Sequence, residues 1–195
     1  MLRAIGRSDR ARWSSLQNFE SWWESRTAKM ARLIPANSTV IEFGAGTRPL
    51  ERMLDSNCKY IASDLVDRGP GTVVCDLNLP PLPDLTHLRP DVAVFAGVLE
   101  YIHDIDSLAR WLSSLVRCCV VSYEPAPPMR QWRQRLGRLR NGYMNAHSEQ
   151  NLLAIFKRAG FVCAKRDAWT NQKIFLLVSL TRDAGAESAA IRPCD

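Results

Sequence analysis

Short apolar runs alternate with polar segments along most of this chain, and glycine, proline, asparagine or aspartate lies near an end of each run. The runs are found at 39–43, 59–64, 72–75, 91–97 and 118–123. Runs of this length near turn-forming residues are typical of strands. The segment DVAVFAG is almost continuously apolar, as in a central parallel strand that is buried on both faces. Helical or irregular crossovers between the runs predict a doubly wound α/β sheet.

Three stretches carry apolar residues at helical spacing. Residues 8–34 repeat them every three to four positions, which predicts one long helix that Pro35 ends. A second helix follows Asp104, and a third lies between Ser148, a good N-cap, and Gly160, which ends it. After this third helix come two strands joined by the link Thr-Asn-Gln, and strands joined so closely pair as an antiparallel hairpin.

These elements divide the chain into four parts. Residues 1–37 are predicted to form an N-terminal helical extension, and residues 38–182 the folded domain. A basic insertion at 125–147 interrupts that domain before its last helix, at an edge of the sheet where α/β folds carry specificity. The tail at 183–195 is alanine-rich and polar, and is expected to fray.

The first apolar run, 39–43, leads into the turn Gly-Ala-Gly-Thr, then into a helix that Arg48 and Pro49 open, and then into a strand that ends at Asp64. Glycines in such a turn let a ligand approach the backbone closely, and a helix N-terminus offers free N–H groups. Glu42 and Asp64 then face one crevice at the carboxyl edge of the sheet. This arrangement predicts a nucleoside cofactor site.

Two features argue against a dinucleotide in this site. The fingerprint GxGxxG is incomplete, because Pro49 stands at its third glycine position. Glu42, two residues before Gly44, would repel a pyrophosphate. A ligand with a cationic end, such as the ammonium and sulfonium of S-adenosylmethionine, is favoured instead.

With EFGAGT at 42–47, the acid at Asp64, and the later VVCDL and FAGVLEYI, the chain resembles the class I S-adenosylmethionine-dependent methyltransferases. The resemblance implies a Rossmann-like, doubly wound, seven-stranded sheet, mostly parallel with a C-terminal antiparallel hairpin, and helices on both faces. It also implies S-adenosyl-L-methionine as the cofactor, with Asp76 accepting from the exocyclic amine of adenine. The implied cofactor residues are Glu42, Gly44, Ala45, Gly46, Asp64, Leu65, Asp76, Leu77, Ala96 and Gly97.

The chain departs from the family pattern in two places. Many members continue the first turn as ExGxGxG, whereas Arg48 occupies the third glycine position here. Arg48 or a neighbouring N–H is therefore expected to meet the methionine carboxylate. The Pro-Pro-aromatic motif that follows the fourth strand in methyltransferases of nucleic-acid bases is also missing, and AGVLEYI stands in its place.

Methyl transfer from a sulfonium is an in-line displacement with a neutral leaving group, so alignment and desolvation are the main requirements. A base is needed only where the acceptor carries a proton that must leave. The catalytic candidates are Glu100 and His103, which follow the fourth strand, and His147. Histidine titrates near neutrality, but Asp104 is a good N-cap and would make His103 an ordinary exposed residue. No convincing set of metal ligands is found in the sequence, so no metal is predicted.

Composition limits the class of protein. The chain has 195 residues, 24% of them charged, and a net charge of +6. Arginines gather near the N-terminus and at 130–140, which suits solvated helices, an anionic substrate or a membrane surface. No apolar run reaches the roughly 18 to 20 residues of a membrane span, and the basic N-terminus lacks the apolar core of a secretory signal. Six cysteines without metal-ligand spacing favour a reduced, cytoplasmic protein.

These features predict an enzyme that transfers a methyl group from S-adenosylmethionine to an oxygen or nitrogen of a small-molecule or glycan acceptor. The arginine-rich insertion favours an acceptor that is itself anionic. An RNA or protein methyltransferase is an alternative that agrees with the basic charge, although nucleic acid is not the favoured partner. A cofactor-binding domain without transfer activity, or an NAD-dependent fold, is another, because a fold alone does not decide function. The oligomeric state is not predicted.

Overall fold

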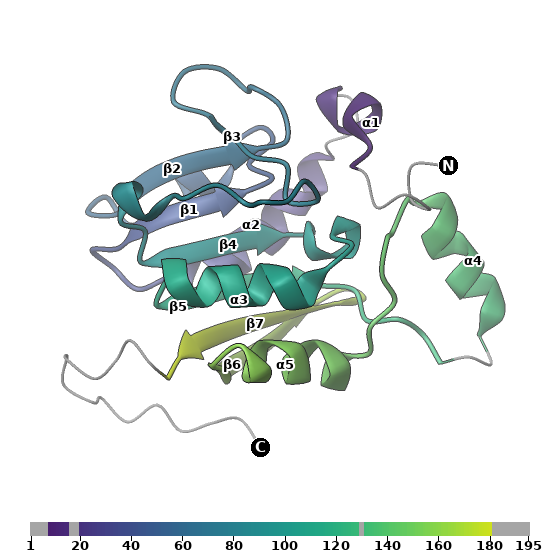
Figure 1. Cartoon of the computed structure of the whole chain (residues 1–195). Helices are drawn as coiled ribbons and strands as arrows, with labels where there is room; N and C mark the ends of the chain where they lie inside the picture. Colours follow the sequence, from purple (N-terminus) through teal and green to yellow (C-terminus); the bar gives the residue numbers. More distant parts are fainter. Residues whose placement is uncertain (1–7, 16–19, 129–130, 181–195) are drawn as a thin grey trace.

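The computed structural model describes residues 8–15, 20–128 and 131–180 (Figure 1). Its helices are α1 (Arg10–Ser14), α2 (Glu24–Ala31), α3 (Ile105–Leu115), α4 (Trp132–Arg140) and α5 (Glu149–Arg158). Short 3-10 turns lie at Ser21–Trp23, Leu50–Arg52, Thr86–Leu88 and Leu99–Tyr101. Its strands are β1 (Thr39–Phe43), β2 (Lys59–Asp64), β3 (Val73–Val74), β4 (Val92–Ala96), β5 (Cys118–Tyr123), β6 (Phe161–Trp169) and β7 (Gln172–Ser179).

The described strands form one seven-stranded sheet in the order β3-β2-β1-β4-β5-β7-β6. Strands β3, β2, β1, β4 and β5 pair in parallel, and β7 pairs antiparallel with both β5 and β6. The chain starts at β1 in the middle, moves to one edge, and returns through β4 to the other side. The predicted doubly wound sheet with a C-terminal antiparallel hairpin is therefore confirmed. The order reverses between β1 and β4, where open α/β sheets bind their ligands.

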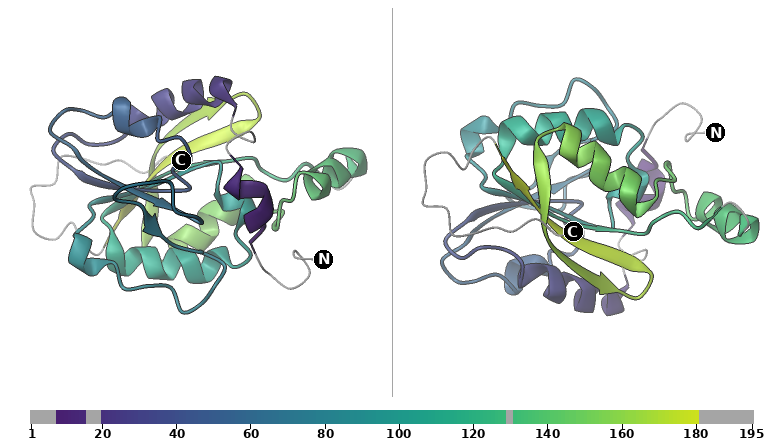
Figure 2. Two further views of the ribbon diagram at one scale, coloured as in Figure 1. Left: turned by 90° about the horizontal axis from the view of Figure 1, so that it is seen from above. Right: turned by 90° about the horizontal axis from the view of Figure 1, so that it is seen from below.

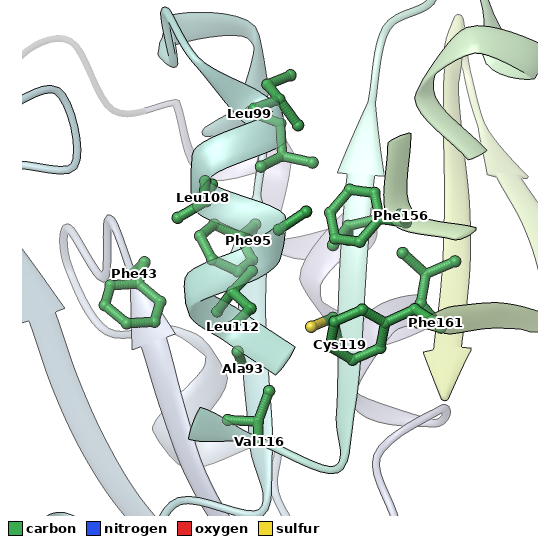
Figure 3. Close-up of a cluster of buried hydrophobic side chains, with 14 of the residues drawn as sticks. Phe43, Ala93, Phe95, Leu99, Leu108, Leu112, Val116, Cys119, Phe156 and Phe161 are labelled. Atoms are coloured by element: carbon green, nitrogen blue, oxygen red, sulfur yellow. The ribbon is translucent and has the colours of Figure 1, made fainter. Parts of the chain in front are cut away.

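Two apolar cores hold the helices against opposite faces of the sheet, because alternate residues of each strand point to opposite faces. On one face, α3 and α5 pack on Phe43, Phe95 and Cys119 through side chains such as Leu108 and Phe156 (Figure 3). On the other face, Met30 of α2 packs with Val40, Val94 and Val120. Helices therefore cover both faces, as the views along the sheet show (Figure 2).

The N-terminal region differs from the single long helix predicted for residues 8–34. Helix α1 ends at Ser14, because Ser15 takes an extended conformation (φ −78°, ψ 125°). Glu20 is extended too (φ −99°, ψ 129°), and α2 begins only at Glu24. The described apolar residues behind the spacing therefore do not share one helix: Trp23 lies in a 3-10 turn, Met30 in α2, and Leu33 after the end of α2. Leu16 and Phe19, which the prediction also used, lie outside the described residues, as does the tail at 183–195.

The helix predicted to open at Arg48 and Pro49 is wrong in extent, because only one 3-10 turn forms there. Arg48 has a positive φ of 57°, so it lies outside the helix. The turn closes when the N–H of Met53 donates to the carbonyl oxygen of Leu50 at 2.9 Å. Leu50 is completely buried in the core beside α2, and Leu54 packs against the same core, so these side chains hold the short crossover on the sheet.

Helix α4 stands apart from the sheet in every view, on the side of the carboxyl ends of β4 and β5 (Figures 1 and 2). It belongs to the predicted basic insertion at 125–147. In the ranges that the structure describes, no helix combines the length and apolar character needed to cross a membrane.

Candidate active site

A cavity of about 840 Å³ opens at the carboxyl ends of β1, β2 and β4. Eight of the predicted cofactor residues line it: Glu42, Gly44, Ala45, Asp64, Leu65, Leu77, Ala96 and Gly97. Gly46 and Asp76, the other two, are outside the lining but contact residues within it. The N-terminal segment and the end of the basic insertion complete the wall, with Arg12, Trp13, Arg26, Arg140 and Met144.

The glycine turn is shaped by contacts that only glycine permits. Gly44 has a φ of 72°, and a Cβ placed on it would lie 2.5 Å from Cγ2 of Val98. The N–H of Ala45 donates to the carbonyl oxygen of Ser63 at 3.0 Å, and the N–H of Gly46 donates to Oδ2 of Asp64 at 2.9 Å. Gly46 therefore positions the carboxylate at the end of β2, and the turn leaves open backbone on the cavity side.

Glu42 closes the floor of the cavity at the end of β1. Its side chain is buried, and its Oε2 accepts a hydrogen bond of 2.5 Å from the hydroxyl of Tyr60. Burial raises the pKa of Glu42 to about 8, although the hydrogen bond from Tyr60 and the nearby Arg26 favour the ionised form. A buried acid of this kind favours a cationic group, which would replace the missing solvent.

Arg26 of α2 reaches the same part of the cavity, although in the sequence it is only a lone arginine in a helical stretch. Its guanidinium donates to the carbonyl oxygen of Ala96 at 3.0 Å and to Oε1 of Gln172 at 3.2 Å. The guanidinium also lies 5.5 Å from the ring centroids of Trp23 and Trp169. Only 6% of the residue is exposed.

Two further observations make Arg26 part of the site. Its Nε is buried and has no hydrogen-bond partner among the residues that the structure describes. Burial lowers its pKa, an effect that Glu100 and Glu42 oppose. A cation and an acid thus lie buried near each other at one end of the cavity.

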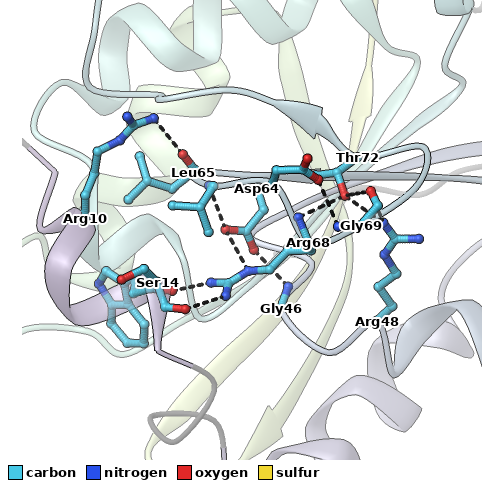
Figure 4. Close-up of polar contacts among 12 residues, drawn as sticks. Arg10, Ser14, Gly46, Arg48, Asp64, Leu65, Arg68, Gly69 and Thr72 are labelled. Carbon is cyan, nitrogen blue, oxygen red and sulfur yellow. Dashed lines mark hydrogen bonds and ion pairs between the residues drawn. The ribbon is translucent and has the colours of Figure 1, made fainter.

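The side chain of Arg48 does not line this cavity, so of the two expectations for the methionine carboxylate, Arg48 or a neighbouring N–H, the lining leaves the second. Its guanidinium donates to the carbonyl oxygens of Gly69 and Pro70 and to Oγ1 of Thr72 at 2.7 Å (Figure 4). Arg48 has a positive φ, and its side chain lies toward this loop. Arg26 occupies the place by the cavity instead.

The carboxylate of Asp64 is bound to the N-terminal segment through Arg68 (Figure 4). Nε of Arg68 lies 3.4 Å from Oδ1 of Asp64, and both side chains are almost completely buried. The guanidinium of Arg68 also donates to the carbonyl oxygens of Trp13 and of Ser14. Helix α1 is therefore fastened over the end of β2, with Arg10 donating to Leu65 as a further tie.

Asp76 makes a second tie to the same segment. The hydroxyl of Ser8 donates to Oδ1 of Asp76 at 2.6 Å, and the backbone N–H of Asn78 donates to the same oxygen at 3.0 Å. In the contact with Asn78, Asp76 accepts from a backbone N–H two residues further along the chain, as aspartate commonly does in turns. The side chain of Asn78 donates to Ser8 and to the carbonyl oxygen of Tyr101. Ser8, Asn78 and Tyr101 all line the cavity.

None of the three candidate bases lines the cavity. His103 is exposed, and its backbone N–H donates to Oδ1 of Asn78 at 2.8 Å, while Asp104 caps α3. His147 lies beyond Tyr123, whose hydroxyl accepts from its backbone N–H. Glu100 is buried, and its Oε1 accepts from the N–H of Glu124 at 2.8 Å. Burial raises the pKa of Glu100 to about 7, and within the described part of the chain its Oε2 has no hydrogen-bond partner.

Aromatic and basic side chains form the end of the cavity beside the insertion. Trp13 and Tyr101 meet edge to face with ring centroids 4.8 Å apart, and Tyr143 meets Tyr101 in the same way at 5.3 Å. Arg12 and Arg140 line this end as well. The aromatic residues give this region flat apolar walls, and the arginines give it positive charge.

Arg138 holds the insertion in place. Only 6% of its side chain is exposed, and its guanidinium donates to the carbonyl oxygen of Glu124 at 2.8 Å and lies 3.6 Å from the carboxylate of Glu124. The guanidinium also lies 4.6 Å from the ring centroid of Tyr143, whose hydroxyl donates to Glu124. The prediction of solvated arginines therefore does not apply to Arg138, which is a structural anchor.

The model of a methyltransferase domain matches residues 15–165 of this chain. Among curated proteins, no sequence matches this chain. Several solved structures share the fold. A protein of Nostoc punctiforme provisionally assigned as an O-methyltransferase is 12% identical, with a TM-score of 0.63 over 80% of this chain and 56% of that one.

Two further structures were solved with cofactor or product. Magnesium protoporphyrin IX methyltransferase of Synechocystis, with S-adenosylhomocysteine bound, is 19% identical, with a TM-score of 0.55 over 81% of each chain. Human N-acetylserotonin methyltransferase, in complex with S-adenosylmethionine, is 16% identical, with a TM-score of 0.63 over 91% of this chain and 58% of that one. The chain thus spans little more than half of the length of the Nostoc and human proteins. It belongs to the methyltransferase domain family, with the fold of the class I S-adenosylmethionine-dependent enzymes.

Proposed function

We propose that this protein transfers a methyl group from S-adenosylmethionine to an oxygen or nitrogen of a small anionic acceptor. The observation that carries the proposal is the buried pair of Glu42 and Arg26 at one end of the cavity, with the glycine turn and Asp64 beside them. The methionine part of the cofactor bears an ammonium and a carboxylate. A buried acid and a buried base in one cavity are complementary to that zwitterion.

We assign the roles in the cofactor site by charge and position. Glu42 accepts from the ammonium, and Arg26 donates to the carboxylate with Nε, which has no hydrogen-bond partner. Asp64 at the end of β2 serves the ribose hydroxyls, and Asp76 serves the adenine amine. Leu65, Leu77, Ala96 and Gly97 flank the adenosine, with Gly44, Ala45 and Gly46 below it.

The acceptor is proposed to occupy the other end of the cavity. Trp13 and Tyr101 would stack on a planar group, and Arg12 and Arg140 would pair with its negative charge. Arg12 and Trp13 come from the predicted N-terminal extension, 1–37, and Arg140 from the insertion at 125–147, whereas Tyr101 follows β4. The two additions to the folded domain would therefore help to select the acceptor. A cavity of about 840 Å³ has the size of small-molecule sites, which favours an anionic small molecule over a polymer.

Catalysis in this site rests on alignment and on exclusion of water. Holding the acceptor atom in line with the methyl group supplies about 7 to 11 kcal/mol of the barrier reduction in well-oriented reactions. Trp13, Tyr101 and Met144 line the cavity, and their apolar surfaces would keep water from the reacting atoms. His103, His147 and Glu100 lie outside the lining, so an acceptor with an acidic proton, such as a phenol or a carboxylate, would suit this enzyme.

The test begins with isothermal titration calorimetry of the purified protein with S-adenosylhomocysteine, S-adenosylmethionine and NAD. Binding of the first two without NAD is the expected result. Incubation with methyl-labelled S-adenosylmethionine and a small-molecule extract should then put the label into a compound that passes a filter, and prior removal of anions from the extract on an anion exchanger should abolish the labelling. Binding of NAD alone would contradict the cofactor assignment. Label in RNA or protein would contradict the acceptor class.

A further inference from the structure

The basic insertion is unusual in charge. Between Glu124 and Glu149 the sequence contains five arginines and no acidic residue. Helix α4 carries four of these arginines in nine residues, and it stands apart from the sheet (Figures 1 and 2). A helix of this length spans roughly 13 Å. It therefore projects a compact positive charge away from the body of the protein.

The two faces of α4 differ. Arg138 points to the protein, where Glu124 and Tyr143 hold it. Arg133, Leu136 and Arg140 lie three and four residues apart, on one stripe of the helix, and all three are exposed. Leu136 is 46% exposed between the two arginines. The outward stripe thus combines positive charge with an apolar side chain.

We infer that the outward stripe of α4, formed by Arg133, Leu136 and Arg140, docks on an anionic lipid surface. The arginines are complementary to the phosphate groups of such a surface. Leu136 favours a lipid surface over other polyanions, because it can enter the boundary between head groups and acyl chains. A nucleic acid has no apolar layer beneath its phosphates into which Leu136 could insert. The inward anchor at Arg138 fixes which face of the helix is presented.

Docking in this orientation brings the cavity to the lipid surface. Arg140 ends α4 and lines the cavity, and Gly142 and Met144 continue the wall. An amphiphilic acceptor with an anionic head could pass from the lipid layer to this end of the cavity without crossing water. This choice of acceptor rests on the proposed methyl transfer, whereas the docking itself depends only on the stripe.

Sedimentation with lipid vesicles tests the inference on the full-length protein. The probes are vesicles of phosphatidylcholine with or without phosphatidylglycerol. The wild-type protein is expected to bind only the anionic vesicles, and to bind them less as salt increases. Arg133→Glu should weaken binding at least fivefold, because one basic residue near an anionic surface contributes about that factor. Arg110→Glu, the same change on the exposed surface of α3, is the matched control and should bind like the wild type.

Leu136→Ser separates lipid from nucleic acid. This variant should lose vesicle binding at least threefold, and its retention of a single-stranded RNA oligonucleotide should not change. Three results would overturn the inference: no binding of the wild-type protein to anionic vesicles, equal weakening by Arg133→Glu and Arg110→Glu, or retention of RNA without binding of vesicles. Calorimetry with S-adenosylhomocysteine on each variant tells a failure of docking from a failure of the cofactor site.

Discussion

The hydroxyl of Tyr60 donates a 2.5 Å hydrogen bond to Oε2 of Glu42, so the acid at the end of β1 is buried with one protein partner. The pKa of Glu42 is about 8 in the folded protein and 4.5 is its ordinary value. The folded state therefore holds the proton more tightly than the unfolded state. The contribution of Glu42 to the free energy of unfolding is fully present below about pH 4.5 and is lost as the pH rises to about 8.

Glu42→Gln should remove this loss. Glutamine keeps an acceptor for Tyr60 but cannot ionise, so the variant should gain about 3 to 5 kcal/mol relative to the wild type between pH 4.5 and 9. Urea unfolding at several pH values measures the difference. Tyr60→Phe is the control for the hydrogen bond itself. A stability difference between Glu42→Gln and the wild type that does not change with pH would contradict the prediction.

Arg26→Met tests the assignment of the cofactor carboxylate. Loss of a charge-assisted hydrogen bond costs about 1.5 to 3 kcal/mol, so the affinity for S-adenosylhomocysteine should fall roughly 10- to 100-fold. The affinity for 5′-methylthioadenosine, which lacks the amino and carboxyl groups, should change less than about threefold. Calorimetry with both ligands gives the two numbers. Equal losses for both ligands would show that Arg26 acts only by supporting the fold.

Gly97→Ala and Gly71→Ala separate backbone strain from contact with Arg26. Both glycines have a positive φ, 70° and 76°, so alanine should cost about 1 to 2 kcal/mol at either position. A Cβ on Gly97 would lie 2.5 Å from Nη1 of Arg26, whereas a Cβ on Gly71 would meet no atom within 4 Å. Gly97→Ala alone should weaken binding of S-adenosylhomocysteine. Thermal unfolding and calorimetry of the two variants check this, and equal binding would refute it.

Arg138→Met should release the insertion. The substitution removes a buried cation from Glu124 and leaves the carboxylate with less compensation, at a cost of about 3 kcal/mol. The amide of Tyr143 donates to the carbonyl oxygen of Arg138, so its hydrogen exchange should become faster. Arg133→Met, on the exposed face of the same helix, should change stability by less than about 0.5 kcal/mol. Unchanged exchange at Tyr143 in the Arg138 variant would show that other contacts hold the segment.

The sheet and the cofactor crevice could be predicted because they depend on local patterns. Buried parallel strands are apolar, and backbone positions with a positive φ favour glycine. The apolar run at 91–97 and Gly44 can therefore be recognised in the sequence. Glu42 and Asp64 followed from their positions at strand ends. The exposed position of His103 was also foreseen as the alternative, since Asp104 caps α3.

The remaining parts of the site depend on contacts between distant residues. Arg26 meets Gln172 across 146 positions, and no local pattern marks that pair. The helical spacing over 8–34 could not show that the chain extends at Ser15. The positions of apolar residues do not report the backbone conformation of the residues between them. The extent of the crossover helix was missed since the positive φ of Arg48 is set by its contacts with the loop at 69–72.

The ties between the N-terminal segment and Asp76 have a kinetic consequence. Ser8 and the N–H of Asn78 already use Oδ1 of Asp76, and Arg68 uses Oδ1 of Asp64 while it holds Trp13 and Ser14. The adenosine proposed for this site would share these carboxylates with the protein's own chain. Entry of the methyl donor and departure of the spent product would then each require the segment to exchange partners. The residence time of the product, more than its equilibrium affinity, would set the pace of turnover.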